Sequence, residues 1–149
     1  DRSALINSLV VVSSCVPGGR FERHVIQASL QNKQRYCAHS CSKRQMRCAL
    51  FDTSTPGSHH AKWEKYIRLR EEMLYSRDAW FMWIDCDAIF TNASFAWEDL
   101  VLNMADRLDA ATIGRYSPDM IMARDRNGFN MGVFFLHNTP WSLGFLNAM

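Results

Sequence analysis

The chain of 149 residues has the length of one domain, and 48% of its residues are hydrophobic, which excludes a disordered protein. Its formal net charge is +2, from 17 basic and 15 acidic residues, and this balance argues against a nucleic-acid or anionic-membrane binder. No apolar run approaches the roughly twenty residues of a membrane-spanning helix, so any membrane attachment is expected to come from an anchor outside this chain.

The first part of the chain predicts strands that alternate with helices. Leu9–Val12 is apolar and β-branched, which indicates a buried strand that ends before a loop at Pro17–Gly19. Residues 21–36 predict a surface helix, whose apolar residues are Phe21, Val25, Ala28 and Leu30. Cys48–Phe51 predicts a second strand. His60–Tyr75 predicts an amphipathic helix with Trp63, Tyr66, Ile67, Met73 and Leu74 on its core side.

The second part of the chain begins with a third apolar strand at residues 80–84. Further elements are predicted in this order: a helix at Trp97–Arg107, strands at Ala110–Ile113 and Met120–Ala123, a polar turn at Arg124–Gly128, a strand at Asn130–Leu136 and a helix from Pro140 onward. Such β-α-β-α-β alternation predicts an α/β fold with a mostly parallel central sheet, helices on its faces and a ligand at the carboxyl ends of the strands.

The cysteines form an odd set of five, so they cannot all pair with one another. Cys37, Cys41 and Cys48 lie close together in sequence. Their C-x3-C spacing lacks a second C-x2-C or H-x3-H half, which a structural zinc site needs. Buried thiols or a local disulfide are therefore favoured over zinc.

Two carboxylates, Asp85 and Asp87, follow the third strand in the stretch WFMWIDCDAIFTN. If the strand continues through them, both side chains point to the same face, because alternate residues of a strand share a face. Paired carboxylates at a strand end suit Mg²⁺ or Mn²⁺, often shared with a phosphate ligand. The alternative is an Asp pair that caps a turn, but its place after the third strand of an α/β pattern favours a ligand site.

Three segments together resemble glycosyltransferase family 34, which groups fungal α-galactosyl- and α-mannosyltransferases with plant xyloglucan xylosyltransferases, or a close relative among the nucleotide-diphospho-sugar transferases. They are HAKWEKYIRLR from His60, WFMWIDCDAIFTN from Trp80 and ARDRNGFNMGVFFLHNTPWSLGFL from Ala123, in the family's order. The resemblance covers Leu9 to Met149 and implies the GT-A type of nucleotide-diphospho-sugar transferase fold. Residues 1–149 are then one truncated GT-A-type domain, since such enzymes continue into a C-terminal region with a His metal ligand and much of the acceptor site.

The resemblance implies a retaining, metal-dependent enzyme that transfers a hexosyl or pentosyl unit from a UDP- or GDP-sugar to a glycan acceptor. Asp87 then binds Mn²⁺, with Mg²⁺ as the alternative, and Asp85 contacts the ribose or the water shell of the metal. Asn130 and Gly132 match the family's N-x-G, in which a carboxamide contacts sugar hydroxyls and a glycine admits the substrate close to the backbone. Asp125 matches an acid near the donor sugar, and an Asx-type turn is its alternative.

Three histidines and one asparagine also bear on this resemblance. His137 stands where the family often has Arg, which puts a charge contact from that position in doubt. His59 and His60 precede a helix and are predicted to be surface residues rather than metal ligands. A eukaryotic member is expected in the Golgi lumen as a type II membrane protein. The N-glycosylation sequon at Asn92 fits that expectation, and plain turn chemistry is its alternative.

Two other functions remain open from the sequence. The chain could be a non-catalytic nucleotide-sugar or glycan-binding fragment, or a pseudo-enzyme. A phosphatase of the haloacid-dehalogenase type also uses D-x-D after a buried strand. That reading is disfavoured, because its motif normally follows the first strand and continues to Gly-Thr, whereas here Ala88, Ile89 and Phe90 follow.

Overall fold

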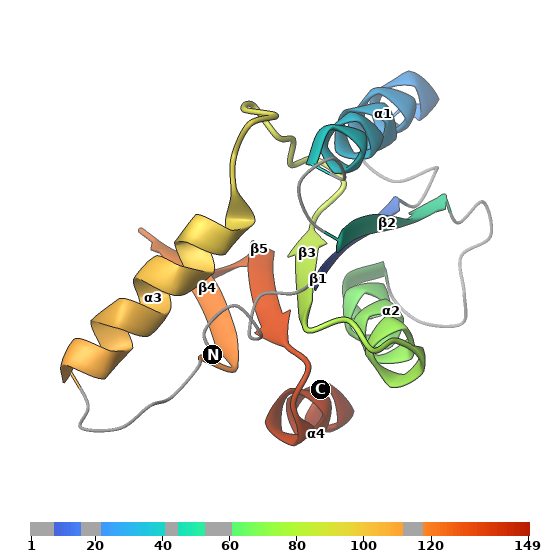
Figure 1. Ribbon diagram of the computed structural model, residues 1–149. Helices are drawn as coiled ribbons and strands as arrows, with labels where there is room; N and C mark the ends of the chain where they lie inside the picture. The colour runs from blue at the N-terminus through green and yellow to red at the C-terminus, as the bar shows by residue number, and fades with distance from the viewer. Residues whose placement is uncertain (1–7, 16–21, 41–44, 53–60, 112–117) are drawn as a thin grey trace.

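The computed structural model describes residues 8–15, 22–40, 45–52, 61–111 and 118–149. Its elements are β1 (Ser8–Cys15), α1 (Arg23–Ser40), β2 (Gln45–Asp52), α2 (Ala61–Tyr75), β3 (Trp80–Ile84), α3 (Trp97–Ala111), β4 (Met120–Asp125), β5 (Gly128–His137) and α4 (Pro140–Ala148) (Figure 1). The predicted β-α-β-α-β order is confirmed. The loop at Pro17–Gly19, His59, His60 and Cys41 lie outside the described residues.

The described strands form a sheet in the order β2-β1-β3-β5-β4. β1 is parallel to β2 and β3, whereas β5 is antiparallel to both β3 and β4. Four of these five strands therefore run in one direction, and the predicted α/β fold with a mostly parallel sheet is confirmed. β5 is reversed because only two residues, Arg126 and Asn127, separate it from β4, and a connection this short can join only antiparallel strands.

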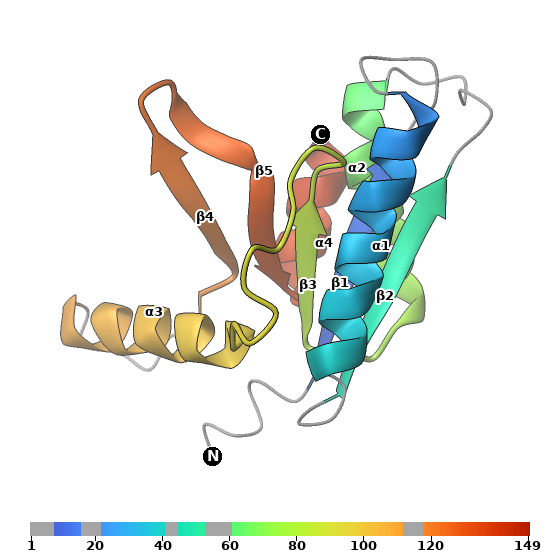
Figure 2. The same ribbon diagram turned by 90° about the horizontal axis from the view of Figure 1, so that it is seen from above.

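Helices cover both faces of this sheet (Figure 1). Leu9 and Val11 of β1 pack with α1 and α3 in one core, and Val10 and Val12 pack with α2 and α4 in the other. β1 and β3 are buried on both sides, which explains why their sequences are continuous apolar runs rather than alternating patterns. Figure 2 shows the β4–β5 hairpin bending away from β1, β2 and β3.

One prediction of local structure was wrong, and another had the wrong bounds. The strand predicted at Ala110–Ile113 is helical at its first two residues, because α3 runs through Ala111, and the other two residues lie outside the described part. Alanine has the highest helix propensity, so the Ala-Ala pair continues a helix readily. The polar turn predicted at Arg124–Gly128 is present, but its bounds were too wide: only Arg126 and Asn127 form the turn, because β4 runs to Asp125 and β5 begins at Gly128, whose φ is +120°.

The helix faces also differ from those predicted. In α1, Val25 and Ala28 are exposed, and the buried stripe consists of Ile26, Ser29, Lys33, Tyr36 and Cys37. In α2, Leu69 and Met73 are buried, whereas Trp63 and Leu74 are about half exposed, at 47% and 48%. The predicted core residue Met73 is buried and Tyr66 and Ile67 are half-buried, so the apolar pattern misplaced the buried face of α1 but only part of that of α2. None of the helices in the described ranges is both long and apolar enough to span a bilayer.

Disulfides join two pairs of cysteines in the described part of the chain. Cys37 at the end of α1 pairs with Cys48 of β2, so the zinc alternative is wrong for these two and the local disulfide is confirmed. Cys15 at the end of β1 pairs with Cys86, which lies between Asp85 and Asp87. This second bridge, which the sequence did not predict, ties the aspartate pair to the neighbouring strand.

Candidate functional site

The aspartate pair lies at the carboxyl end of β3, in the middle of the sheet. The Asp85 amide donates to the Gly132 carbonyl at 2.8 Å, and the Ala88 amide donates to the Asp85 carbonyl at 3.1 Å, so the chain turns directly after the strand. β3 itself ends at Ile84. The prediction that strand alternation turns both carboxylates to one face was therefore wrong, because Asp87 belongs to a turn.

The Asp85 carboxylate is held by two donors from the structure around it. Lys65 of α2 places its Nζ 3.1 Å from Asp85 Oδ1 and also donates to the Met131 carbonyl at 3.1 Å. The indole Nε1 of Trp83 donates to the same Oδ1. Lys65 also lies 5.7 Å from the centre of the Trp83 ring, within range of a cation–π contact. These contacts fix the orientation of Asp85.

Gly132 of β5 lies directly against Asp85. A Cβ at Gly132 would stand 3.2 Å from Asp85 Oδ2 and 3.0 Å from Asn130 Oδ1, closer than side chains normally pack. The Gly132 amide donates to Asn130 Oδ1 at 2.8 Å, and Asn130 Nδ2 donates to Asp125 Oδ2 at 3.2 Å. The structure therefore brings Asp85, Gly132, Asn130 and Asp125 into one continuous series of contacts.

Asp125 also makes the turn contact that was its alternative explanation. Its Oδ1 accepts a hydrogen bond from the Asn127 amide at 2.7 Å, which is an Asx turn at the tip of the β4–β5 hairpin. The same kind of contact occurs at Asn92, whose Oδ1 accepts from the Ser94 amide at 2.9 Å. Asp125 and Asn130 are both exposed, and their roles toward a donor sugar stay predictions.

The Asp87 side chain is less constrained by its neighbours than the Asp85 side chain. Its side chain is exposed and makes no hydrogen bond or ion pair with the described residues. Within those residues no group of three or more His, Cys, Asp or Glu could enclose a metal ion. Carboxylate oxygens are the ligands that Mg²⁺ and Mn²⁺ prefer, so Asp87 and the open Oδ2 of Asp85 fit part of a coordination sphere.

Helix α1 contributes site residues that the sequence pattern missed. Lys33 is fully buried, and its Nζ donates to the Ala88 carbonyl at 2.9 Å, to the Cys86 carbonyl at 3.4 Å and to Ser29 Oγ. Burial lowers the pKa of Lys33 to about 8, while the negative charges of Asp87 and Asp85 oppose this shift. The signal available in the sequence was positional: Lys33 falls at helical spacing between Ser29 and Tyr36 on the buried stripe.

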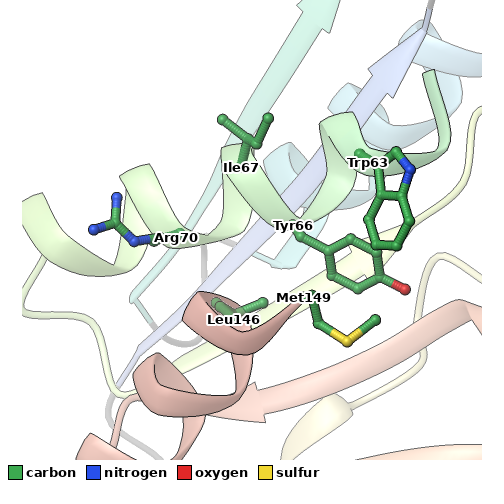
Figure 3. Close-up of a pocket in the computed structure, with 6 residues that line it drawn as sticks. All are labelled: Trp63, Tyr66, Ile67, Arg70, Leu146 and Met149. Atoms are coloured by element: carbon green, nitrogen blue, oxygen red, sulfur yellow. The ribbon is translucent and has the colours of Figure 1, made fainter. Parts of the chain in front are cut away.

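A separate pocket of about 220 Å³ lies between α2 and α4 (Figure 3). Its described lining residues are Trp63, Tyr66, Ile67, Arg70, Leu146 and Met149. This lining includes no carboxylate and none of the predicted site residues. Burial, and then the negative charge of Asp85, raise the pKa of Tyr66. The polar cluster at the end of β3, and not this pocket, is therefore the candidate site.

Comparison with known proteins finds similar glycosyltransferases. Residues 7–149 match the model of the galactosyl transferase GMA12/MNN10 family. The chain is 31% identical to "Probable glycosyltransferase 6" of Oryza sativa subsp. japonica over 126 residues, which cover 84% of this chain and 24% of that protein. It is 28% identical to "Xyloglucan 6-xylosyltransferase 1" of Arabidopsis thaliana over 130 residues, which cover 84% of this chain and 26% of that protein.

Solved structures support the fold. A glycosyltransferase involved in the glycosylation of the major capsid of PBCV-1 superimposes with a TM-score of 0.63 at 13% identity, covering 95% of this chain and 64% of the other. The glycosyltransferase GlyE of Streptococcus pneumoniae TIGR4 superimposes with a TM-score of 0.51 at 13% identity, covering 93% of this chain and 36% of that protein. The chain spans about a quarter of the length of the curated relatives above. Through the match over residues 7–149, it belongs to the galactosyl transferase GMA12/MNN10 family, glycosyltransferase family 34.

Proposed function

We propose that this chain forms the donor-binding part of a glycosyltransferase that moves a hexosyl or pentosyl unit from a nucleotide-diphosphate sugar to a glycan acceptor. The observation that carries the proposal is the pair formed by Asp85 and Asp87 at the central strand end. Lys65 and Trp83 orient the Asp85 carboxylate, whereas the Asp87 carboxylate is exposed and makes no hydrogen bond or ion pair with the described residues. The family match over residues 7–149 supports the class of reaction.

Asp85 and Asp87 would hold a divalent ion, Mn²⁺ or Mg²⁺, together with the diphosphate of the donor. Such an ion supplies positive charge where the leaving nucleoside diphosphate gains negative charge. Further ligands would come from the substrate. Lys65 does not need to bind phosphate in this arrangement, because its ammonium group already donates to both the Asp85 carboxylate and the Met131 carbonyl.

The hairpin residues Asn130, Gly132 and Asp125 would contact the donor sugar. Asn130 uses one of its two amide hydrogens on Asp125, and the other remains for a sugar hydroxyl. Gly132 leaves space beside Asp85 that a side chain would fill. A retaining outcome is part of the proposal through family membership alone.

The proposed location is the Golgi lumen, with membrane attachment through an anchor outside this chain. The disulfides Cys15–Cys86 and Cys37–Cys48 support it, because disulfides form and persist in oxidising compartments such as the secretory pathway. The exposed Asn92 would be available for glycosylation there.

Thermal unfolding with Mn²⁺ and either UDP or GDP tests the proposal. A ligand that binds only the folded chain, at a hundredfold above its dissociation constant, stabilises by about 2.7 kcal/mol. We expect one nucleotide with Mn²⁺ to raise the melting temperature, and Asp87→Ala to remove this rise because it removes a metal ligand. Asp99→Ala, at an exposed acid on α3, is the matched control and should keep the rise.

The outcomes separate the candidate functions. If neither nucleotide shifts melting with Mn²⁺, or if Asp87→Ala responds like the wild type, the proposed donor site is wrong. Nucleotide binding without sugar transfer by the full-length enzyme would indicate a non-catalytic binding module instead.

A further inference from the structure

One face of α1 is directed at the segment that follows the aspartate pair, and Figures 1 and 2 both show the helix beside this segment. Lys33 donates to the carbonyls of Cys86 and Ala88, on either side of Asp87, and the Ser29 hydroxyl donates to the Cys86 carbonyl. Farther along, Asn32 exchanges two hydrogen bonds with the backbone of Phe90, at 2.9 and 2.8 Å. The Tyr36 hydroxyl donates to the Phe95 carbonyl at 2.9 Å, so the helix holds the loop in three separate places.

Lys33 occupies a position where an apolar side chain would ordinarily be expected. Ile26, Tyr36 and Cys37 lie on the same stripe, and all of them are buried in the core. Lys33 is buried as well, and its hydrogen-bond acceptors are two backbone carbonyls and a hydroxyl group. Burying an ammonium group is costly even when it is hydrogen-bonded. Packing alone does not account for a lysine at this position, whereas its contacts with the loop do.

These contacts fix the backbone on both sides of Asp87. Lys33 Nζ donates to the carbonyls of Cys86 and Ala88, the residues directly before and after it. The disulfide from Cys15 holds the side chain of Cys86 from the direction of β1. Asp87 itself makes no hydrogen bond or ion pair with the described residues, so its position depends on this backbone.

Lys33 also supplies the charge that the turn needs. Asp87 and Asp85 are both close enough to interact electrostatically with its ammonium group. Two neighbouring carboxylates repel each other, and the buried positive charge of Lys33 offsets this repulsion together with Lys65, whose Nζ lies 3.1 Å from Asp85 Oδ1. The turn can therefore keep one geometry before a metal ion arrives.

We propose that Lys33 is a positioning residue for donor binding, which holds the Asp85–Ala88 turn in the geometry that binds the metal–nucleotide pair. This inference rests on the proposed function of the same turn. Lys33 is fully buried, so it acts through the turn rather than by touching the ligand.

The variant Lys33→Met tests this role, because methionine has a similar length and lacks both the charge and the donors. The first measurement needs no ligand: hydrogen exchange of the Ala88 amide, which closes the turn onto the Asp85 carbonyl. We expect exchange to become faster by about tenfold, since hydrogen bonds to charged groups contribute strongly. The second measurement is calorimetric titration of Mn²⁺ in the presence of UDP or GDP. We expect the affinity to fall by about tenfold or more, as it does when groups that orient metal ligands are removed.

Asn32→Leu is the matched control. It removes the hydrogen bonds from the same helix to Phe90, so it should reduce stability while Mn²⁺ affinity and Ala88 exchange stay near wild type. If Lys33→Met does not fold, Ser29→Ala replaces it. That variant removes the hydroxyl that contacts both Lys33 and the Cys86 carbonyl, and a smaller change in the same direction is expected.

The inference fails if Lys33→Met leaves both measurements unchanged, or if Asn32→Leu loses as much affinity as Lys33→Met. A wild-type chain that binds no Mn²⁺ with either nucleotide contradicts the proposed function instead. In that case faster Ala88 exchange in Lys33→Met still supports the hold of Lys33 on the turn, and unchanged exchange contradicts it.

Discussion

At Gly132 the backbone of β5 approaches the Asp85 carboxylate so closely that a Cβ would stand 3.2 Å from Oδ2. Its φ is not in the left-handed region, since Gly128 is the glycine with positive φ in the described part of the chain. Glycine is therefore required here because a side chain would crowd Asp85 and Asn130, and not because of the backbone conformation. A substitution at Gly132 should therefore change ligand binding more than it changes the stability of the fold.

Gly132→Ala should weaken the binding of Mn²⁺ with nucleotide and leave stability nearly unchanged. The new methyl group displaces Asp85 Oδ2 or Asn130 Oδ1, whereas the lower entropy of the unfolded chain offsets the crowding by about 0.4–1 kcal/mol. Calorimetric titration and urea unfolding measure the two effects.

Gly144→Ala is the control for that change. A Cβ at Gly144 would meet nothing within 4 Å, and this exposed residue lies inside α4. It should stabilise the chain by about 1 kcal/mol, through helix propensity, without altering affinity. Equal affinities for wild type and Gly132→Ala would show that the space beside Asp85 is not used by the ligand.

Among the elements, β5 carries a titrating group into the sheet. His137, at the end of β5, pairs with Trp80 of β3, and the two rings stack with centres 4.8 Å apart. Burial lowers the pKa of His137, while the negative charge of Asp119 opposes this shift. The lowered pKa favours the neutral form of the His137 ring.

The pH dependence of stability should reflect this histidine. When the pH falls through the ordinary histidine pKa of about 6.5, the unfolded chain takes up a proton before the folded chain does, so the free energy of unfolding decreases. The decrease ends below the lowered pKa of the folded state. Urea unfolding of wild type and His137→Phe, at about pH 7.5 and about pH 5.5, measures the difference.

His137→Phe keeps a ring beside Trp80 and removes the titration. It should therefore lose less stability on acidification than wild type does. An equal loss in both proteins would mean that other groups account for the pH dependence.

At the scale of the whole molecule, two disulfides close loops of very different size. Cys15 and Cys86 are 71 residues apart in sequence, and Cys37 and Cys48 are 11 apart. In the chain-entropy model a bridge stabilises by restricting the unfolded chain, by about 4 kcal/mol for the long loop and about 3 kcal/mol for the short one.

Replacing Cys15 and Cys86 together by serine should therefore reduce the free energy of unfolding more than replacing Cys37 and Cys48. The first pair should also weaken Mn²⁺ binding with nucleotide, because Cys86 lies between Asp85 and Asp87, whereas the second pair should leave affinity unchanged. Urea unfolding and calorimetric titration test both statements. Equal affinity losses in the two double variants would contradict the role assigned to the Cys15–Cys86 bridge.

The sequence by itself determined the order of strands and helices along the chain through β3, the position of the aspartate pair after β3, and the family. A strand that is buried on both faces must be apolar. An apolar run can be recognised within one segment of the sequence, without knowing what packs against it. Asp85, Gly132, Asn130 and Asp125 were predicted as site residues, but the contacts that join them were not predicted.

Only the tertiary structure decided which helix faces are buried and what holds the turn. Lys33 meets the Cys86 carbonyl across 53 residues, and Lys65 meets Asp85 across 20. Such pairs depend on how α1 and α2 dock against the sheet edge, where backbone carbonyls and carboxylates attract polar side chains that periodicity assigns to solvent. The Cys15–Cys86 bridge is of the same kind, since the parallel pairing of β1 with β3 brings its two halves together.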